Sequence, residues 1–112
     1  QELHLGRVQL HDRCVVGIRS IIETGAVLKN VVMMGADHYE SQSTPPPGAP
    51  PIGIGAHTTI TNAIVDKNAR IGQRVVISPD GKPPEYDGDN YYIRDGIVIV
   101  PKNAVIPDGT WI

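Results

Sequence analysis

Large aliphatic side chains recur at nearly every sixth position along most of this chain, and this spacing predicts its fold. In the central segment, residues 54–77, the recurring positions are Ile54, Ile60, Val65, Ile71 and Ile77. A smaller or β-branched residue stands two positions before most of them, and residues two apart point to the same face of a short strand. A six-residue repeat of strand and turn is typical of a parallel β-helix, whose stacked coils bury a continuous apolar column.

The same spacing extends to both sides of the central segment. The inward positions that it predicts are Leu10, Val16, Ile22, Leu28 and Met34 on the N-terminal side, and Val100, Ile106 and Ile112 on the C-terminal side. Val32 is expected to point inward with Met34, and only the step from Ile60 to Val65 is one residue short. Because spacings of three and four are not sustained and most of these positions are β-branched, we expect almost no helix.

Two segments interrupt the repeat. Residues 40–51, ESQSTPPPGAPP, separate Met34 from Ile54, and their prolines cannot donate to a strand ladder. Residues 79–90, PDGKPPEYDGDN, are polar and rich in turn formers, and we expect them to be mobile. The sequence therefore predicts one all-β domain over residues 1–112, a single-stranded parallel β-helix of about four coils with two extruded loops.

Composition narrows the range of partners. At 112 residues and 40% hydrophobic content, the chain can bury one narrow core. A net charge of -2 argues against nucleic acid or an anionic membrane as a principal partner, and no apolar run has membrane-spanning length. The single cysteine cannot form an internal disulfide, which favours a reducing compartment such as the cytoplasm or the plastid stroma.

Counting across the second interruption brings two cations together. Since three six-residue units make one coil, the strict count makes Arg94 the next inward position after Ile77 and stacks it about 4.8 Å from Val65. Arg94 would then lie near Lys67, at the following turn. A buried guanidinium without a partner is costly, so we expect Arg94 to face out or to be neutralised by an acidic neighbour or an anion.

Several other reactive residues have simpler interpretations. Cys14 falls on an inward position, where a small buried hydrophobe is more common than a nucleophile. Asp37, His38 and Glu40 are expected to hydrogen-bond the turn at the entry to the first loop. Trp111 is expected to face outward, between two inward residues. The four histidines form no HExxH motif and no pair with ligand spacing, so we predict no metal site.

Three segments of the sequence resemble one known family. VVMMGADHYE, IGIGAHTTITNAIVDKNARIG and YYIRDGIVIVPKNAVIPDGTWI are similar, in the same order, to the C-terminal left-handed β-helix domain of ADP-glucose pyrophosphorylase (glucose-1-phosphate adenylyltransferase) of the cyanobacterial and plant type. The likeness covers about residues 15–112. The left-handed sense of the helix is implied by this resemblance alone.

The resemblance implies a division of labour within a larger enzyme. Catalysis belongs to an N-terminal nucleotidyltransferase domain, which this chain does not contain, so we expect no catalytic residue and no cofactor here and Mg²⁺ in the full-length enzyme. The expected reaction joins ATP and glucose 1-phosphate to give ADP-glucose and pyrophosphate, in glycogen synthesis in the bacterial cytoplasm or starch synthesis in the plastid stroma.

The family's β-helix domain is associated with regulation and assembly. The implied partners are the enzyme's own catalytic domain, the other subunits of a homo- or hetero-tetramer, and the effectors 3-phosphoglycerate and inorganic phosphate. Lys67 in DKNARIG and Arg94 in YYIRDGIV match two basic positions that the family uses for activator and phosphate binding.

Two alternatives remain at this stage. A free-standing hexapeptide-repeat acyltransferase would use a histidine at a subunit interface as general base, with His38 or His57 as the candidate. A purely structural assembly module would share the fold and bind no effector.

Overall fold

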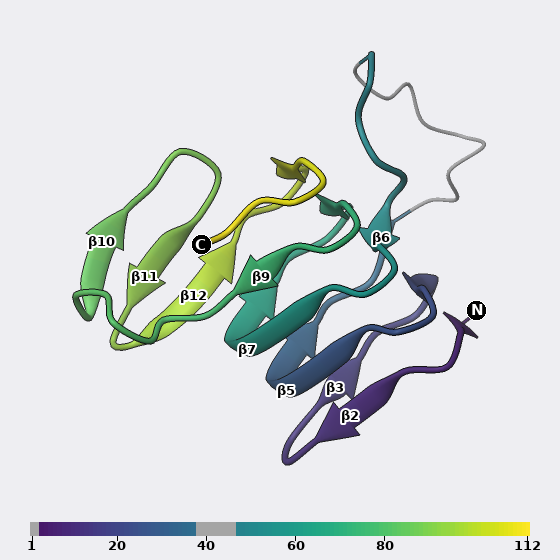
Figure 1. The fold of residues 1–112 in the computed structure, drawn as a ribbon, viewed down its shortest axis with the longest axis horizontal. Coiled ribbons are helices and arrows are strands. Elements are labelled where there is room, and N and C mark those ends of the chain that lie inside the picture. The colour runs from purple at the N-terminus through teal and green to yellow at the C-terminus, as the bar shows by residue number, and fades with distance from the viewer. Residues whose placement is uncertain (1–2, 38–46) are drawn as a thin grey trace.

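The computed structural model describes residues 3–37 and 47–112, and within these residues every regular element is a strand (Figure 1). This confirms the expectation of an all-β chain for the described residues. The strands are β1 Leu3–Leu5, β2 Gln9–His11, β3 Val15–Val16, β4 Ser20–Ile22, β5 Val27–Met33, β6 Gly53–Ile54, β7 Thr59–Val65, β8 Arg70–Ile71, β9 Val76–Ile77, β10 Glu85–Asp87, β11 Tyr92–Arg94, β12 Ile97–Val100 and β13 Val105–Ile106.

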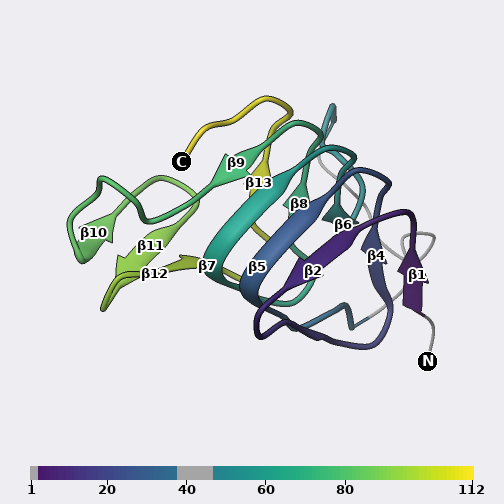
Figure 2. The ribbon, with the colours of Figure 1, turned by 60° about the horizontal axis from the view of Figure 1, so that its bottom comes forward.

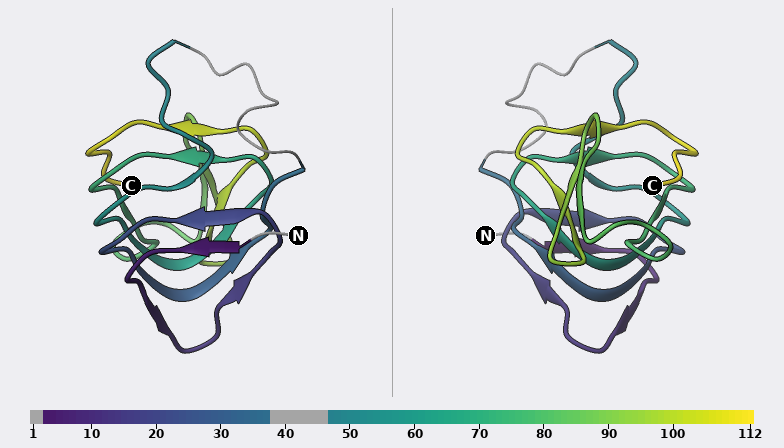
Figure 3. Two further views of the ribbon diagram at one scale, coloured as in Figure 1. Left: turned by 90° about the vertical axis from the view of Figure 1, so that its right-hand side faces the viewer. Right: turned by 90° about the vertical axis from the view of Figure 1, so that its left-hand side faces the viewer.

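The strands form two sheets that are parallel over most of their extent. The five-stranded sheet has the order β1-β4-β6-β8-β13, and every pair in it is parallel. In the larger sheet β2, β5, β7 and β12 follow one another in parallel, while β3 pairs with β5 and β9 with β7. Figure 2 shows β2, β5 and β7 side by side, and Figure 3 looks along the long axis, where the first coil (purple) outlines a triangle.

The pairing register aligns buried apolar side chains in three columns, and all of them except Met33 are at predicted positions. The first column is Ile22, Ile54, Ile71 and Ile106, the second is Leu28, Ile60 and Ile77, and the third is Met33, Val65 and Val100. Each of these side chains is at most 4% exposed. Burial of this apolar surface is the main favourable contribution to folding, at roughly 25 cal/mol per Å².

The predicted inward positions are wrong in two places: Leu10 pairs with Leu28 in the first coil but is 43% exposed, and the residues around Met34 are shifted by one. Val31 and Met33 are the buried pair, whereas Val32 and Met34 are 38% and 43% exposed. The cause is Asn30, whose left-handed backbone (φ 54°) turns the corner inside β5 and shortens the step from Leu28 by one residue. β7 makes the same corner at Asn62 (φ 50°), and the Asn30 amide donates to Asn62 Oδ1 at 3.0 Å.

The second interruption also differs from the prediction. Instead of an irregular loop, the chain forms a hairpin in which β10 pairs antiparallel with β11, and β11 with β12. The buried Ile93 joins this hairpin to the core. The repeat resumes only afterwards, so that Val100, and not Arg94, pairs with Val65. For the first predicted loop, residues 40–46 lie outside the described residues.

Candidate functional site

A row of equivalent turns stacks at the corner that follows β3, β5, β7 and β12. Their backbones are linked by hydrogen bonds from Ala36 N–H to Ile18 O (3.2 Å), from Asn68 N–H to Gly35 O (3.1 Å) and from Asn103 N–H to Lys67 O (3.0 Å). In this ladder of hydrogen bonds, Lys67 stacks on Gly35 of the preceding coil, and Lys102 stacks on Lys67. We call the group Asp37, Lys67, Asn68, Lys102 and Asn103 the lysine corner.

The sequence Lys-Asn-Ala occurs twice at this corner and explains its shape. Asn68 and Asn103 adopt left-handed backbones (φ 62° and 65°), which asparagine tolerates better than most residues. The alanines that follow them, Ala69 and Ala104, point into the core and are 3% and 8% exposed. Each copy therefore turns the chain at its asparagine and leaves the preceding lysine on the outside.

The two lysines share one carboxylate. Lys67 Nζ lies 3.2 Å from Asp37 Oδ1, and Lys102 Nζ lies 3.4 Å from Asp37 Oδ2. All three side chains are between 40% and 54% exposed. The hydrogen bond from Lys67 is the main cause that holds the pKa of Asp37 below its ordinary value; Lys102 adds to the effect and partial burial opposes it.

Asn68 fixes the position of Asp37. Its Oδ1 accepts from Asp37 N–H at 2.9 Å, and its Nδ2 donates to Asp37 Oδ2 at 3.4 Å. Asn68 itself is buried, at 6% exposure. Gly35 leaves room for this arrangement, because its φ is 89° and a Cβ atom there would collide with the carbonyl oxygen of Ile18.

Two further charged residues, Arg19 and Asp66, lie next to the lysine corner. Arg19 Nη1 donates to Ala36 O at 3.2 Å, so a third cationic side chain reaches the same row of turns. Asp66 lies next to Lys67, and its Oδ1 accepts from Lys67 N–H at 2.7 Å. The lysine corner thus presents an anion held between exposed ammonium groups on a hydrogen-bonded backbone.

Arg94 is not at the lysine corner, and the prediction that it lies near Lys67 is wrong. It pairs with Ile97 at the far end of the hairpin, while Val98 pairs with Ala63. The register therefore puts Arg94 level with Asn62, which is five residues before Lys67. This corresponds to roughly 15 Å along the strand direction.

Of the alternatives expected for Arg94, the structure shows an exposed side chain that is paired with acidic neighbours. Its Nη2 lies 2.6 Å from Asp87 Oδ1 and its Nε lies 3.9 Å from Glu85 Oε1, while Nη1 donates to the carbonyl oxygens of Tyr86 (3.1 Å) and Ile93 (2.9 Å). The Asp87 carboxylate is the main cause that raises the pKa of Arg94. Arg94 therefore holds the hairpin together, and its side chain is 47% exposed.

Lys102 is the residue that the sequence interpretation missed. The strict six-residue count assigned the second cation of this corner to Arg94, because it assumed that the repeat restarts directly after residue 90. The repeated Lys-Asn-Ala was the signal that identifies the equivalent turns. It lies two residues after Val65 in one coil and two residues after Val100 in the next.

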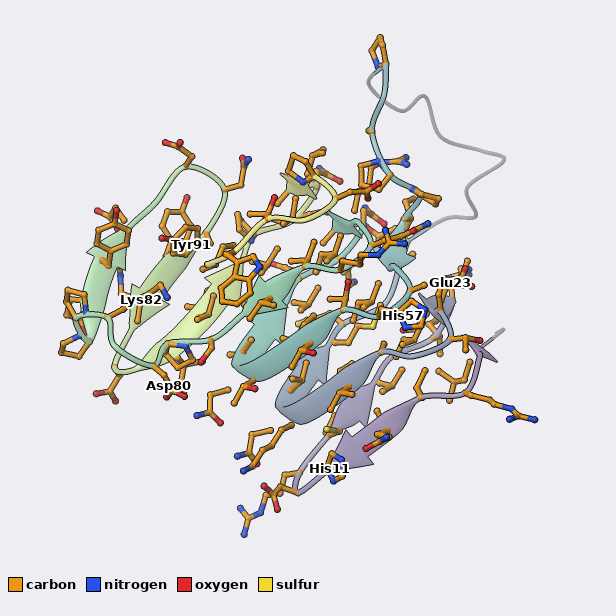
Figure 4. All side chains as sticks on the ribbon, in the orientation of Figure 1. His11, Glu23, His57, Asp80, Lys82 and Tyr91 are labelled. Carbon is orange, nitrogen blue, oxygen red and sulfur yellow. The ribbon has the colours of Figure 1, made fainter. Side chains whose placement is uncertain are left out.

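The remaining candidates keep their simple interpretations. Cys14 is half-buried against the core, with Sγ 3.5 Å from Leu28 O, and Trp111 faces outward at 80% exposure, as predicted. His57 is exposed at a turn, where Figure 4 shows it close to Glu23. His38 and Glu40 lie outside the described residues.

A cleft of about 560 Å³ lies over the outer face of β6 and β8. Its charged lining residues are Glu23 and Asp108, so it does not suit an anion. In the described part of the chain, no group of three or more histidine, cysteine or acidic side chains could hold a metal ion. The same residues contain no helix that is long and apolar enough to cross a membrane.

The pairing of the strands defines a parallel β-helix, and comparison with known protein families identifies the family to which this β-helix belongs. The model of the GLGC left-handed parallel beta-helix domain matches residues 5–111. The chain belongs to this family, that of the C-terminal β-helix domain of ADP-glucose pyrophosphorylase. Membership also gives the helix its left-handed sense.

Proposed function

We propose that this chain is the regulatory and subunit-assembly domain of a glucose-1-phosphate adenylyltransferase, and that it binds anionic effectors through Lys67 and Arg94. The enzyme makes ADP-glucose and pyrophosphate from ATP and glucose 1-phosphate, for glycogen or starch synthesis. The observation that carries the proposal is the exposed ammonium group of Lys67, held on a hydrogen-bonded corner within a chain of this family.

The proposal includes an organisation of the whole enzyme. Residues 1–112 form one domain of about four coils with two extruded segments, which the three columns of paired aliphatics support. Catalysis and Mg²⁺ binding belong to a separate nucleotidyltransferase domain, and this domain supplies no catalytic group.

The effectors that fit are small oxyanions. The effectors 3-phosphoglycerate and inorganic phosphate both carry phosphoryl oxygens, which accept charge-assisted hydrogen bonds from ammonium and guanidinium groups. Lys67 and Arg94 lie roughly 15 Å apart along the strand direction, so we assign them to separate anion-binding positions. Each is exposed, at 44% and 47% of its side chain.

Assembly is supported by surfaces that the domain leaves open. β1 and β13 are the edges of the five-stranded sheet, and edge strands offer backbone groups for pairing. Leu5, Leu10 and Trp111 are 40%, 43% and 80% exposed. We therefore propose contacts with the enzyme's own catalytic domain and with other subunits of a homo- or hetero-tetramer.

The test uses the full-length enzyme. We expect it to form ADP-glucose, with Lys67→Ala and Arg94→Ala each raising the concentration of 3-phosphoglycerate needed for half-maximal activation by about threefold or more while leaving unactivated turnover near wild type. Lys29→Ala is the matched control, since Lys29 is 55% exposed and pairs with Asp12 elsewhere. Unchanged activation curves in both test variants would reject the effector assignment.

The exposed edges and Trp111 also favour a second candidate, a purely structural assembly module. A structural module would form the same oligomer. In that case neither Lys67→Ala nor Arg94→Ala would change the activity of the full-length enzyme at any concentration of 3-phosphoglycerate. The activation curves therefore separate the two candidates.

A further inference from the structure

We infer that a neutral sugar ring binds in a small cavity between the turn of the β10–β11 hairpin and the last coil, where it stacks on aromatic side chains. The cavity has a volume of about 310 Å³. Residues 86–91 line it from the hairpin, and residues 106, 107 and 110–112 line it from the last coil. The cavity shares no residue with the lysine corner, so the inference does not depend on the proposed function.

Aromatic side chains are concentrated around this cavity. The chain has four tyrosines, one tryptophan and no phenylalanine, and Tyr86, Tyr91 and Trp111 all line the cavity. The rings of Tyr86 and Tyr91 have centroids 5.8 Å apart, with their planes inclined by 31°. Trp111 is 80% exposed and Tyr86 is 44% exposed. The C–H groups of a sugar ring pack on such faces, because the face of an aromatic ring is both apolar and electron-rich.

The polar groups beside these rings match the hydroxyl groups of a sugar. The Asn90 amide donates to Val105 O at 3.0 Å, which leaves Asn90 Oδ1 as an acceptor. Asp89 adds a carboxylate that forms no ion pair within the described residues. The tyrosine hydroxyls and the indole N–H of Trp111 can donate. Because a sugar hydroxyl both donates and accepts, it can pair with either kind of group.

Hydrogen bonds hold both walls of the cavity in place. Gly88 N–H donates to Tyr91 O at 2.9 Å and closes the hairpin turn. A Cβ atom at Gly88 would collide with the ring of Tyr91, so this glycine lets the ring lie against the turn (Figure 4). On the other wall, Trp111 forms a bridge with Val76, and Ile112 N–H donates to Val76 O at 2.8 Å. A ligand would therefore have few groups to order on binding.

Charge separates a sugar from other small ligands. Asp87 and Asp89 line the cavity, and their carboxylates repel an anion such as phosphate. An organic cation is the main competitor, because aromatic faces and carboxylates attract ammonium groups. However, Arg94 Nη2 already lies 2.6 Å from Asp87 Oδ1 and offsets its charge. A cation would use only the acceptors of the cavity, whereas a sugar uses its acceptors and its donors.

The experiment titrates maltotriose and cellotriose into this chain and follows tryptophan fluorescence. Trp111 is the only tryptophan, so its emission reports on the cavity directly. We expect a saturable change with maltotriose, and Tyr86→Ala should raise the Kd about threefold or more through the lost stacking surface. Tyr92→Ala is the matched control, because Tyr92 is a tyrosine of the same hairpin with 41% exposure and does not line the cavity.

Trp111→Leu is a second test variant. Trp111 faces outward, so its replacement should leave the fold intact, and amide dispersion reports whether each variant is folded. NMR shifts of the amides of residues 88–91 replace fluorescence for this variant, and we expect the Kd for maltotriose to rise about threefold or more. Tetramethylammonium is the probe for the competing cation, and we expect it to cause no saturable shift at these amides.

The inference is overturned if neither sugar gives a saturable change, if Tyr86→Ala binds the sugar as tightly as Tyr92→Ala, or if tetramethylammonium binds more tightly than both sugars. It is also overturned if the emission of Trp111 depends on protein concentration but not on sugar, because another subunit then covers the cavity. The proposed function is tested separately. Binding of cellotriose without maltotriose would support the sugar site and argue against a link with glycogen or starch, whose glucose units are joined as in maltotriose.

Discussion

Lys67 and Lys102 stack directly on each other in consecutive coils, with Asn103 N–H donating to Lys67 O at 3.0 Å. Two like charges on neighbouring turns repel each other unless an anion lies between them, and Asp37 supplies that anion in this structure. The corner is therefore a cluster in which one carboxylate offsets the charge of two ammonium groups.

The ion pairs of Asp37 make stability depend on pH in a defined direction. The folded pKa of Asp37 is lowered from its ordinary value of 3.8, so its contribution is complete above that value and is lost as the pH falls through the folded pKa. We expect the stability difference between wild type and Asp37→Asn to be larger at pH 6 than at pH 3, as measured by urea unfolding. A difference that is equal or larger at pH 3 would contradict this.

The central column of the core should be the most sensitive to truncation. Ile60 is fully buried in β7, between Leu28 and Ile77. We expect Ile60→Ala to lower the free energy of unfolding by about 3 to 4 kcal/mol, through lost burial and a residual cavity. Ile18→Ala removes the same atoms at a site 53% exposed and should cost less than about 1 kcal/mol. Similar losses in the two variants, measured by urea unfolding, would contradict the predicted register.

Arg94 should control the local stability of the hairpin rather than that of the coils. Lysine cannot reproduce the simultaneous contacts with Asp87 and with the carbonyl oxygens of Tyr86 and Ile93. We expect Arg94→Lys to speed amide hydrogen exchange in β10 about threefold to tenfold and to leave β8 unchanged. Arg74→Lys is the control, because the hydrogen bond of Arg74 to Gln73 is only a 3.5 Å contact. Equal rates in β10 of both variants would show that Arg94 does not hold the hairpin.

The sequence predicted the coils well because the six-residue period reports burial directly. Ile54, Ile60, Val65, Ile71 and Ile77 are all buried as predicted. The prediction was wrong at Met34, because a corner made by one left-handed residue, Asn30, uses one residue fewer than a full turn. Asn62 makes the equivalent corner in β7 and explains the short step from Ile60 to Val65, which is visible in the sequence. The six-residue period alone does not show that the corner at Asn30 has the same shape.

The candidate site could be predicted only in part. A count of residues assumes that an insertion contains no strand of its own, and the hairpin ending at Arg94 breaks that assumption. Asp37 is fixed by Asn68 from a coil 31 residues later, a contact that no local pattern encodes. The expectation that Arg94 meets Lys67 at the corner was wrong, and Lys102 is the residue that stacks on Lys67 there.

The pairing of Lys67 with Lys102 can be measured most directly by cross-linking. In a Cys14→Ser background, the double variants Lys67→Cys/Lys102→Cys and Lys67→Cys/Arg94→Cys would be oxidised and their free thiols counted. Neighbouring strands lie about 4.8 Å apart, within the range that a disulfide spans, whereas Arg94 lies roughly 15 Å away along the strand direction. We predict intramolecular disulfide formation in the first variant and free thiols in the second. Cross-linking of the second variant, with free thiols in the first, would contradict the register on which the lysine corner rests.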